Sequence, residues 1–518
     1  DKYDTGFDMP DRVCEKCGTN MNKNGLNIPF ATFLGFNGDK EPDIDLNFAG
    51  EYQPIAHKFV GEIFGEENIF KAGTVATIAE KTAFGYVKKY EENTGKSFSN
   101  SEELVLANGC TGTKRTTGQH PGGIIVVPAD REIFEFCPVQ KPANNRDAEF
   151  ITTHFDYHKI DKNLLKLDIL GHDVPQMIRH LQDMTGVDPL GIDIADKKTL
   201  SIFTSIDALN IVNPDDYEFK HGTYGIPEFG TNFTRGMLDA IKPKTISALI
   251  KISGFSHGTD VWTNNAEDLI KNGVATIDEL ISCRDDIMNY LMIKGVDKSN
   301  AFKIMEAVRK NKELKQEELD IMKEHGVPDW YVESCRTLKY LFPRAHAAAY
   351  VMMALRMAWF KVYYPSAFYC AWLSTKIDNF DVNVARGGVE AAKAALSSLN
   401  SEDDDTSAAK KKELKVVYEV IYELLSRGCE FSLPELGVSD PCMFNVVDDK
   451  IKIPFMAVSG VGRSAAISLA EAYKEGPFLS IDEVQRKTKL SSTNIEDLKA
   501  CGVFDELPDS AQVSIFDM

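Results

Sequence analysis

Residues 42–48, PDIDLNF, alternate polar or acidic side chains with apolar ones. In a β-strand, alternate side chains point to the same face, so Asp43 and Asp45 would project together while the apolar residues enter a core. Two carboxylates held this close repel each other, and bound divalent cations relieve the repulsion. Paired cations of this kind catalyse phosphoryl transfer. For an isolated pair of acids, an acidic strand end that faces solvent or caps a turn is the alternative.

A second apolar run, at residues 164–170, contains one acid, Asp168. A carboxylate among buried aliphatic side chains is costly to keep charged unless a cation pairs with it. Lys166 would lie on the same face of a strand and could be that cation, and a bound metal ion is the other possibility. The two acidic strands together favour a metal site built from Asp43, Asp45 and Asp168.

The composition is that of an ordinary globular protein of several domains. The chain has 518 residues, of which 43% are hydrophobic and 26% charged, so it is neither collagen-like nor disordered as a whole. Its formal net charge is −20, so a polyanion must be met by local basic patches. Ten scattered cysteines suit a reducing cytoplasm, and the longest apolar run is too short to span a membrane.

The pattern of apolar residues changes along the chain. Residues 1–50 indicate strands and loops, and residues 51–107 turn helical and suggest a small insertion. Strand-like runs return at 122–128 and 164–170 and would flank that insertion. Residues 174–428 are mostly helical, and a mixed tail follows.

Three polar segments could contact phosphates or bases. Residues 114–123 form a glycine-rich loop before a strand and contain Arg115 and His120. Residues 331–376 carry six basic residues and one acid with interleaved aromatic rings. The residues of interest in the helical part are Ser256, His257, Arg344, His346 and Tyr350. An ordinary loop, buried core aromatics and simple helix caps are the alternatives.

Several long motifs occur in register along nearly the whole chain. In order they are KEPDIDLNFAGEYQ, RTTGQHPGGIIVVP, LLKLDILGHD, GIPEFGTNF, SGFSHGTDVW and FPRAHAAAYVMMALRMAWFKVYYP. Together they resemble the C-family bacterial replicative DNA polymerase III alpha subunit of PolC type. A set of motifs in the same order is far more specific than any one of them.

The resemblance implies an α+β, multidomain fold with a polymerase-β-like nucleotidyltransferase palm. Residues 1–50 would form the first part of the palm and residues 109–173 its second part, with a helical thumb inserted at 51–108. Residues 174–428 would form large helical fingers. Residues 429–518 would form a duplex-binding helix-hairpin-helix tail.

The resemblance also implies template-directed DNA synthesis in the bacterial cytoplasm. Asp43, Asp45 and Asp168 align with the catalytic triad of the family, which binds two Mg²⁺ and transfers dNMP from a dNTP to a primer 3′-hydroxyl. The partners implied are primer–template DNA, dNTP and other replisome subunits. The expected nucleotide or phosphate contacts are Lys166, Arg115, His120, Ser256, His257, Arg344, His346 and Tyr350.

Two features of the tail fit this picture. Gly460, Gly462 and Arg463 lie in a turn similar to a helix-hairpin-helix, which grips DNA phosphates through backbone N–H groups. An ordinary helix start after a glycine turn is the alternative. The residues Gln512, Ser514, Ile515 and Phe516 look like a peptide that binds the β sliding clamp.

Cys14 and Cys17 have the spacing of half a zinc site, but the chain has no second CxxC. In the PolC family the partner cysteines lie upstream, so we expect this chain to be part of a longer protein and Zn²⁺ binding to need that upstream part. A catalytically incomplete fragment that binds DNA and clamp is therefore one alternative function. A two-metal nuclease built on the same carboxylates is another.

Overall fold

The computed structural model describes residues 3–38, 44–141, 150–160, 164–399 and 407–510. Contacts between residues divide the chain into two compact units, residues 33–176 and residues 1–32 with 177–518. The first contains a mixed sheet and the second is mainly helical, so the α+β prediction is confirmed at this level. We expected residues 1–50 to belong with the sheet, but the first 32 residues group with the helical unit.

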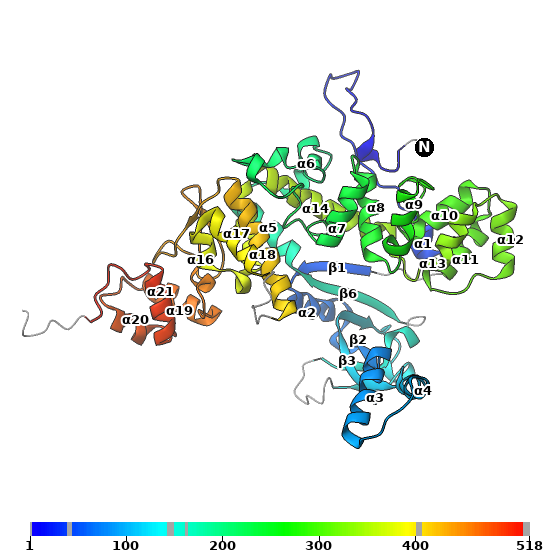
Figure 1. Ribbon diagram of the computed structural model, residues 1–518, viewed down its shortest axis with the longest axis horizontal. Coiled ribbons are helices and arrows are strands. Elements are labelled where there is room, and N and C mark those ends of the chain that lie inside the picture. The colour runs from blue at the N-terminus through cyan, green and yellow to red at the C-terminus, as the bar shows by residue number, and fades with distance from the viewer. Residues whose placement is uncertain (1–2, 39–43, 142–149, 161–163, 400–406, 511–518) are drawn as a thin grey trace, which may run out of the picture. The chain divides into compact units, whose positions relative to one another are not determined.

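The unit at residues 33–176 is built on one six-stranded sheet with the order β1-β6-β3-β2-β5-β4, of which β1, β6, β2 and β3 are labelled in Figure 1. Strands β1 and β6 are parallel, as are β2 and β5, whereas β3 is antiparallel to both of its neighbours. The strands are β1 (Ile44–Ala49), β2 (Ile69–Thr77), β3 (Lys114–Val126), β4 (Val139–Gln140), β5 (Thr152–Asp156) and β6 (Leu165–His172).

Helix α2 (Gln53–Phe64) packs on one face of this sheet. Its Ala56 and Val60 join a buried cluster with Ile124, Leu167 and Ile169 from the central strands. Strand residues alternate between faces, so Asp168 points to the face opposite the one that α2 covers.

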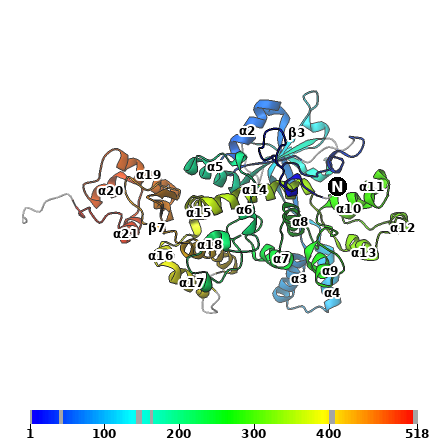
Figure 2. The ribbon, with the colours of Figure 1, turned by 90° about the horizontal axis from the view of Figure 1, so that it is seen from above.

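Two further helices, α3 (Glu80–Thr94) and α4 (Asn100–Cys110), connect β2 to β3. They lie side by side in both ribbon views (Figures 1 and 2) and share a small core of Ala83, Val87 and Ala107. The sequence predicts a helical insertion at residues 51–107, and α2, α3 and most of α4 fall in that range. The strand β2 within it was missed, because the run IFKAGTVAT lies between two helical patterns and is interrupted by Gly73.

The segment at residues 114–123 also differs from the prediction. The sequence indicates a glycine-rich loop there, but the structure continues β3 back to Lys114 and pairs it with β2. Glycine weakens a strand, but here pairing with β2 supplies the backbone hydrogen bonds that keep this segment extended.

The second unit is mainly helical, as the sequence predicted. Within it α8 packs against α14, α10 against α11, and α17 against α18. Its helices up to residue 426 are α5 (Asp173–Thr185), which begins at the junction of the units, α6 (Lys197–Ser201), α7 (Asn232–Ile241), α8 (Ile246–His257), α9 (Glu267–Lys271), α10 (Arg284–Ile293), α11 (Lys298–Arg309), α12 (Gln316–Glu324), α13 (Asp329–Thr337), α14 (Arg344–Tyr363), α15 (Pro365–Ser374), α16 (Val382–Arg386), α17 (Gly388–Ser398) and α18 (Ala408–Ser426).

A fully buried ion pair joins α14 to α18. Lys361 Nζ lies 2.5 Å from a carboxylate oxygen of Glu423, which also accepts a hydrogen bond from Tyr369 Oη at 2.8 Å. Burial lowers the pKa of Lys361 to about 8 although Glu423 opposes the shift. One basic residue of the stretch at 331–376 therefore stabilises the interior and is not available to a ligand.

The N-terminal residues are tied to α8. Asp8 accepts hydrogen bonds from the backbone N–H groups of Ile246 and Ser247, at 2.8 and 2.9 Å, and so caps the start of this helix. Asp4 accepts a hydrogen bond from the Ser247 hydroxyl at 3.0 Å. These contacts explain why the first residues group with the helical unit.

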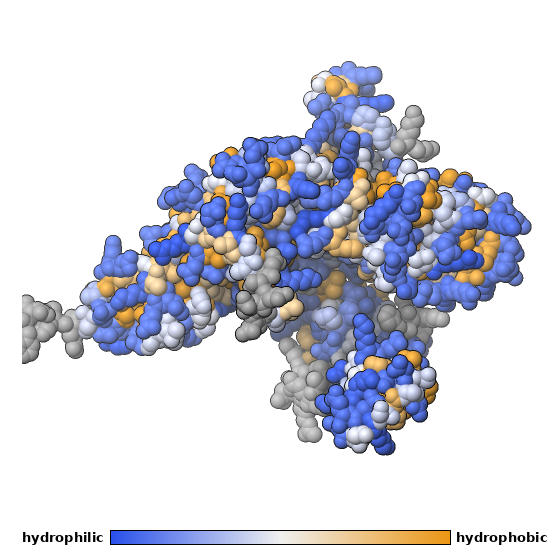
Figure 3. Space-filling view, in the orientation of Figure 1, coloured by the Kyte–Doolittle hydropathy of each residue, from blue (hydrophilic) through white to orange (hydrophobic). Residues whose placement is uncertain are grey.

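The tail begins with a small sheet of the order β7-β9-β8, formed by β7 (Phe431–Ser432), β8 (Asn445–Val447) and β9 (Lys450–Lys452). Three short helices follow it and lie together in Figure 1: α19 (Arg463–Lys474), α20 (Ile481–Lys487) and α21 (Ser492–Ala500). Across the described residues, every helix is either too short or too polar to cross a membrane. The face shown in Figure 3 is mostly hydrophilic, with small apolar patches.

Candidate functional site

Two of the three predicted acids lie next to each other. The parallel pairing of β1 and β6 places Asp45 directly opposite Asp168. Partners in register point to the same face of a sheet, so the two carboxylates share one side although 122 residues separate them along the chain. Asp43 lies outside the described residues.

The two oxygens of Asp168 have different surroundings. Lys166 Nζ lies 3.0 Å from Oδ2, so the ion pair that the sequence left open is present. Oδ1 is buried and accepts no hydrogen bond from any described residue. A buried carboxylate oxygen without a donor is costly and is suited to bind a cation.

His120 lies beside Asp168, with 3.5 Å between its Nδ1 and Asp168 Oδ1. The same Nδ1 accepts hydrogen bonds from the backbone N–H groups of Gly123 and Gly122, at 2.8 and 3.3 Å. A nitrogen that accepts these bonds carries no proton, so the neutral ring holds its proton on Nε2. His120 therefore gives no proton to Asp168 and leaves Oδ1 open.

Glycine is required at position 123. A Cβ there would lie 2.9 Å from His120 Nδ1 and 3.0 Å from the Cβ of Ala72. Gly123 pairs with Asp168 across the antiparallel β3–β6 ladder, so a side chain there would displace His120, which lies beside the carboxylate. The sequence motif gave no direct sign of this role.

The residues present fit a divalent cation in part. Asp45 and Asp168 supply carboxylate oxygens, the ligand type that Mg²⁺ prefers. Among the described residues no cluster of three or more histidine, cysteine or acidic side chains has the spacing to hold a metal ion. A complete site needs further oxygens, from water, from substrate phosphates or from Asp43.

Arg115 is exposed on the extended part of β3. Thr116 and Thr117 follow it and pair with Ala76 and Val75 of β2. Lys166 is half-buried, and its Nζ lies 4.8 Å from the centre of the Tyr157 ring. The two basic residues thus differ, because Lys166 is held by Asp168 and Tyr157 whereas Arg115 faces solvent.

In the helical unit, His257, His346 and Tyr350 form one aromatic cluster. The ring centres of His257 and His346 are 5.4 Å apart, and those of His346 and Tyr350 are 4.6 Å apart. Phe342 stacks on His346 at 4.7 Å. Ser256 precedes His257 at the end of α8, and its hydroxyl donates a hydrogen bond to the Ser253 carbonyl at 2.8 Å.

Glu228 completes this cluster and was missed from the sequence. Its carboxylate pairs with Nε2 of His257 and fixes the direction of the ring. The backbone of Glu228 has φ of 69°, a left-handed conformation that side chains other than glycine rarely adopt. Its position inside the motif GIPEFGTNF is the only sign that the sequence offers.

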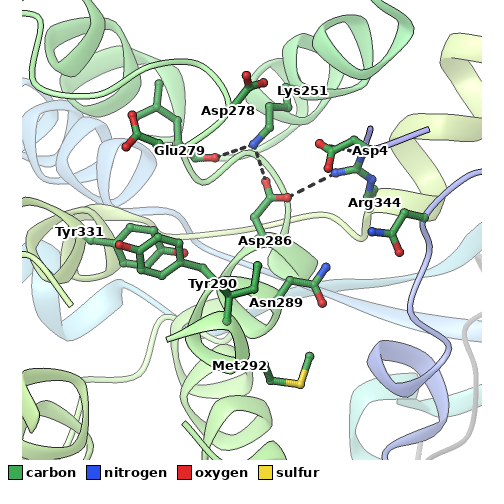
Figure 4. A pocket seen from close by; sticks show the side chains of 13 residues that line it. Asp4, Lys251, Asp278, Glu279, Asp286, Asn289, Tyr290, Met292, Tyr331 and Arg344 are labelled. Carbon is green, nitrogen blue, oxygen red and sulfur yellow. Dashed lines mark hydrogen bonds and ion pairs between the residues drawn. The ribbon is translucent and has the colours of Figure 1, made fainter. Parts of the chain in front are cut away.

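Arg344 faces a different environment from His346, which lies two residues further on α14. Its guanidinium is buried and lies 3.6 Å from Asp286 and 3.5 Å from Asp4 (Figure 4). Lys251 also lies 3.6 Å from Asp286. Burial alone would raise the pKa of Asp286, but Lys251 and Arg344 together with hydrogen bonds from Ser282 bring it below its ordinary value.

These charges line a pocket of about 440 Å³ in the helical unit, which Figure 4 shows. Tyr290 and Tyr331 stack on each other at one side of it, with ring centres 4.0 Å apart. The pocket also has exposed acids, Asp278 and Glu279. Arg344 is therefore held by acids within an acidic pocket.

The tail contains the predicted turn. Gly460 has φ of 75°, and its carbonyl accepts a hydrogen bond from Asn494 Nδ2 at 2.8 Å, which ties the turn to α21. Gly462 precedes α19, and Arg463 is the first residue of that helix and is exposed. The first N–H groups of a helix have no partner within it, so this end can receive an anion.

The last predicted residues are the two cysteines of the half zinc site and the clamp-binding peptide. Cys14 and Cys17 have free thiols, and hydrogen bonds from the side chain and backbone of Thr19 lower the pKa of Cys17. The expected clamp-binding residues Gln512, Ser514, Ile515 and Phe516 lie outside the described residues.

Three models of known families match parts of this chain. Residues 17–102 and 88–171 match the bacterial DNA polymerase III alpha NTPase domain, and residues 174–327 match the bacterial DNA polymerase III alpha subunit finger domain. Residues 428–513 match a helix-hairpin-helix motif. The chain belongs to the bacterial DNA polymerase III alpha family of PolC type.

Curated relatives with the name DNA polymerase III PolC-type match the chain over almost its whole length. The protein of Caldanaerobacter subterraneus is 51% identical over 514 residues, 99% of this chain and 36% of the relative. That of Oceanobacillus iheyensis is 50% identical over 512 residues, 99% and 36%, and that of Thermotoga maritima 49% over 516 residues, 100% and 38%. The chain thus spans little more than a third of the length of these PolC-type relatives.

Proposed function

We propose that this PolC-type chain carries the nucleotidyl-transfer site of a bacterial replicative DNA polymerase. The pairing of Asp45 with Asp168 across β1 and β6 is the observation that supports this proposal. Residues 33–176 would then be the palm, with α3 and α4 as the thumb, and the helical unit would supply the fingers. Asp43 would be the third catalytic acid.

In this proposal a primer 3′-hydroxyl attacks the α-phosphate of a dNTP. A bond forms between the 3′-oxygen and the α-phosphorus, and the bond to pyrophosphate breaks. Two Mg²⁺, when bound, would favour loss of the hydroxyl proton and neutralise charge on the phosphates. Asp45 and Asp168 would hold these ions through carboxylate oxygens. Lys166 satisfies Asp168 Oδ2 and leaves Oδ1 for the metal.

Each unit, taken by itself, carries cationic or aromatic side chains that are candidate nucleotide contacts. Arg115, His120 and Lys166 would face phosphates from the sheet. In the helical unit we propose the cluster of Ser256, His257, His346 and Tyr350, because Glu228 fixes its rings in one orientation. Arg344 would support the cluster as the first residue of α14, since its own charge is held by Asp286.

Duplex DNA would be held by the tail. The turn at Gly460 and Gly462 and the exposed Arg463 would bind phosphates of the duplex without reading bases. The C-terminal peptide would bind the β sliding clamp, and other replisome subunits would complete the assembly. Zn²⁺ would need ligands in addition to Cys14 and Cys17.

Primer extension tests this function. A labelled primer–template is incubated with dNTPs and Mg²⁺ and each protein. We expect extension by the unchanged chain and a loss of at least about a hundredfold in the Asp45→Asn and Asp168→Asn variants, because an amide cannot neutralise a metal ion. The exposed Glu62→Gln variant on α2 is the control and keeps full activity. Extension that survives Asp168→Asn contradicts the proposal.

The partial coverage of the relatives and the helix-hairpin-helix match favour a second candidate. The chain could act as a DNA- and clamp-binding fragment that is catalytically incomplete by itself. It then binds duplex DNA but extends no primer, even without substitution. Degradation of labelled DNA without dNTPs would instead identify a two-metal nuclease.

A further inference from the structure

The face of the sheet under α2 contains a buried lysine. Lys71 on β2 is 8% exposed, and among the described residues no carboxylate pairs with it. Its Nζ lies 2.8 Å from Nδ1 of His57 on α2, which is 5% exposed, and 5.3 Å from the centre of the Phe150 ring. Such a pair is costly, because neither a neutral histidine nor a ring fully replaces water around an ammonium group.

The contact with Lys71 sets the proton position of His57. A charged lysine can only donate, so Nδ1 of His57 accepts and the neutral ring carries its proton on Nε2. Burial and Lys71 lower the pKa of His57, whereas the nearby backbone carbonyls of Ile169 and Gly122 raise it. The balance of these effects leaves the pKa of His57 below its ordinary value.

Gln53 lies one turn before His57 in α2 and contacts the backbone of β6 and β3. Its Nε2 donates a hydrogen bond to the carbonyl of Ile169 at 2.7 Å and approaches that of Pro121 at 3.3 Å. Residues four apart in a helix lie on one side, so Gln53 and His57 face the two strands together. Ile169 directly follows Asp168 in β6.

The strands approach closely at this place. A Cβ on Gly122 would lie 2.6 Å from the carbonyl oxygen of Ile169, so no side chain can separate the two backbones. The pairing of β2 with β3 is irregular between Lys71 and Gly73, so regular ladder bonds are interrupted beside the pair. The position of the backbone here depends on the groups that α2 supplies.

We propose that Gln53, His57 and Lys71 form a brace that positions Asp168 through the backbone of β6 and β3. The three are positioning residues, because Gln53 bonds to the backbone of β6, His57 lies near the same carbonyl on the face opposite the carboxylates, and Lys71 acts through His57. Lys71 holds the His57 ring, and Gln53 and His57 hold the carbonyl side of the strands. This inference rests on the proposed function for its kinetic test but not for its structural one.

Four variants test the brace. Lys71→Met removes the donor and keeps the length of the side chain, and Lys71→Arg keeps a charged donor. Gln53→Met removes the second contact. Glu62→Gln, exposed on α2, is the matched control. For each we measure amide hydrogen exchange of residues 168–170, the thermal midpoint, and the Mg²⁺ concentration that gives half-maximal primer extension.

We expect Lys71→Met and Gln53→Met to raise the half-maximal Mg²⁺ concentration about tenfold, with the KM for primer–template unchanged. Exchange at residues 168–170 should increase about tenfold without a lower thermal midpoint. Lys71→Arg should keep the exchange rates and the half-maximal Mg²⁺ concentration close to those of the unchanged chain. The brace is overturned if folded Lys71→Met has the same exchange rates and Mg²⁺ dependence as the unchanged chain. It is also overturned if Lys71→Arg shows the same losses as Lys71→Met.

The exchange measurement separates this proposal from the proposed function. If the unchanged chain extends no primer, the polymerase proposal fails for this chain, and exchange at residues 168–170 still supports or overturns the brace. If the chain extends a primer but the variants change neither the exchange rates at residues 168–170 nor the Mg²⁺ dependence, only the brace proposal fails.

Discussion

At the scale of single residues, the acids could be predicted and their neighbours could not. The sequence indicated Asp45 and Asp168 because a charged side chain in an apolar strand is costly to bury unless a cation pairs with it. It also indicated Lys166 as a partner, and the structure confirms that ion pair. Glu228, Gln53 and Lys71 act through contacts between segments far apart in the chain, and no local pattern encodes such contacts.

The stability of the folded chain should depend on pH through Lys71. Burial lowers its pKa to about 8, below the ordinary value near 10.5, so between these values the unfolded chain binds more protons than the folded one. The free energy of unfolding should therefore rise as pH increases from 8 to about 10, by up to ~3 kcal/mol. Lys71→Met should lose this rise and be no less stable at pH 7. Urea unfolding followed by circular dichroism across this range checks it.

Glu228 gives a prediction about nucleotide binding. Glu228→Gln removes the charge that holds His257 and leaves the ring less well oriented. A hydrogen bond to a charged group contributes about 1.5–3 kcal/mol, so we expect the KM for dNTP to rise by about tenfold or more. Steady-state extension kinetics measure this, with exposed Glu218→Gln as the control. An unchanged KM would remove the cluster from the nucleotide site.

At the scale of secondary structure elements, helices were easier to predict than strands. Amphipathic periodicity indicated the helices of residues 174–428, since each must bury one side. Strand β2 and the first half of β3 lacked such a pattern, because both are stabilised by pairing with each other. The half-site at Cys14 and Cys17 gave no hint that its segment packs on α8.

The start of α8 gives a prediction about stability. Asp8 accepts hydrogen bonds from two backbone N–H groups at this end, and Asp8→Ala should lower the free energy of unfolding by about 0.5–2 kcal/mol. Asp8→Asn keeps an acceptor oxygen and should lose less. Denaturant unfolding of both variants measures the difference, and equal losses would show that the side-chain oxygen contributes nothing.

At the scale of the whole molecule, the net charge opposes the binding of a polyanion. The chain has a formal net charge of −20, so DNA must be held by local groups. Removal of one phosphate contact in Arg463→Gln should weaken duplex binding at any sequence. It should also reduce the slope of log K against log salt by about 0.9. Fluorescence anisotropy at several salt concentrations measures both, and an unchanged slope would exclude Arg463 from the contact.

The order of segments along the chain has a consequence for biosynthesis. Residues 33–176 form a unit of their own, inserted between the N-terminal segment and the α8 that this segment caps. A ribosome makes about 5–20 residues per second, so Asp8 waits for more than ten seconds before Ser247 emerges. The sheet can fold in that interval, whereas the early segment must stay exposed, where chaperones and proteases can reach it.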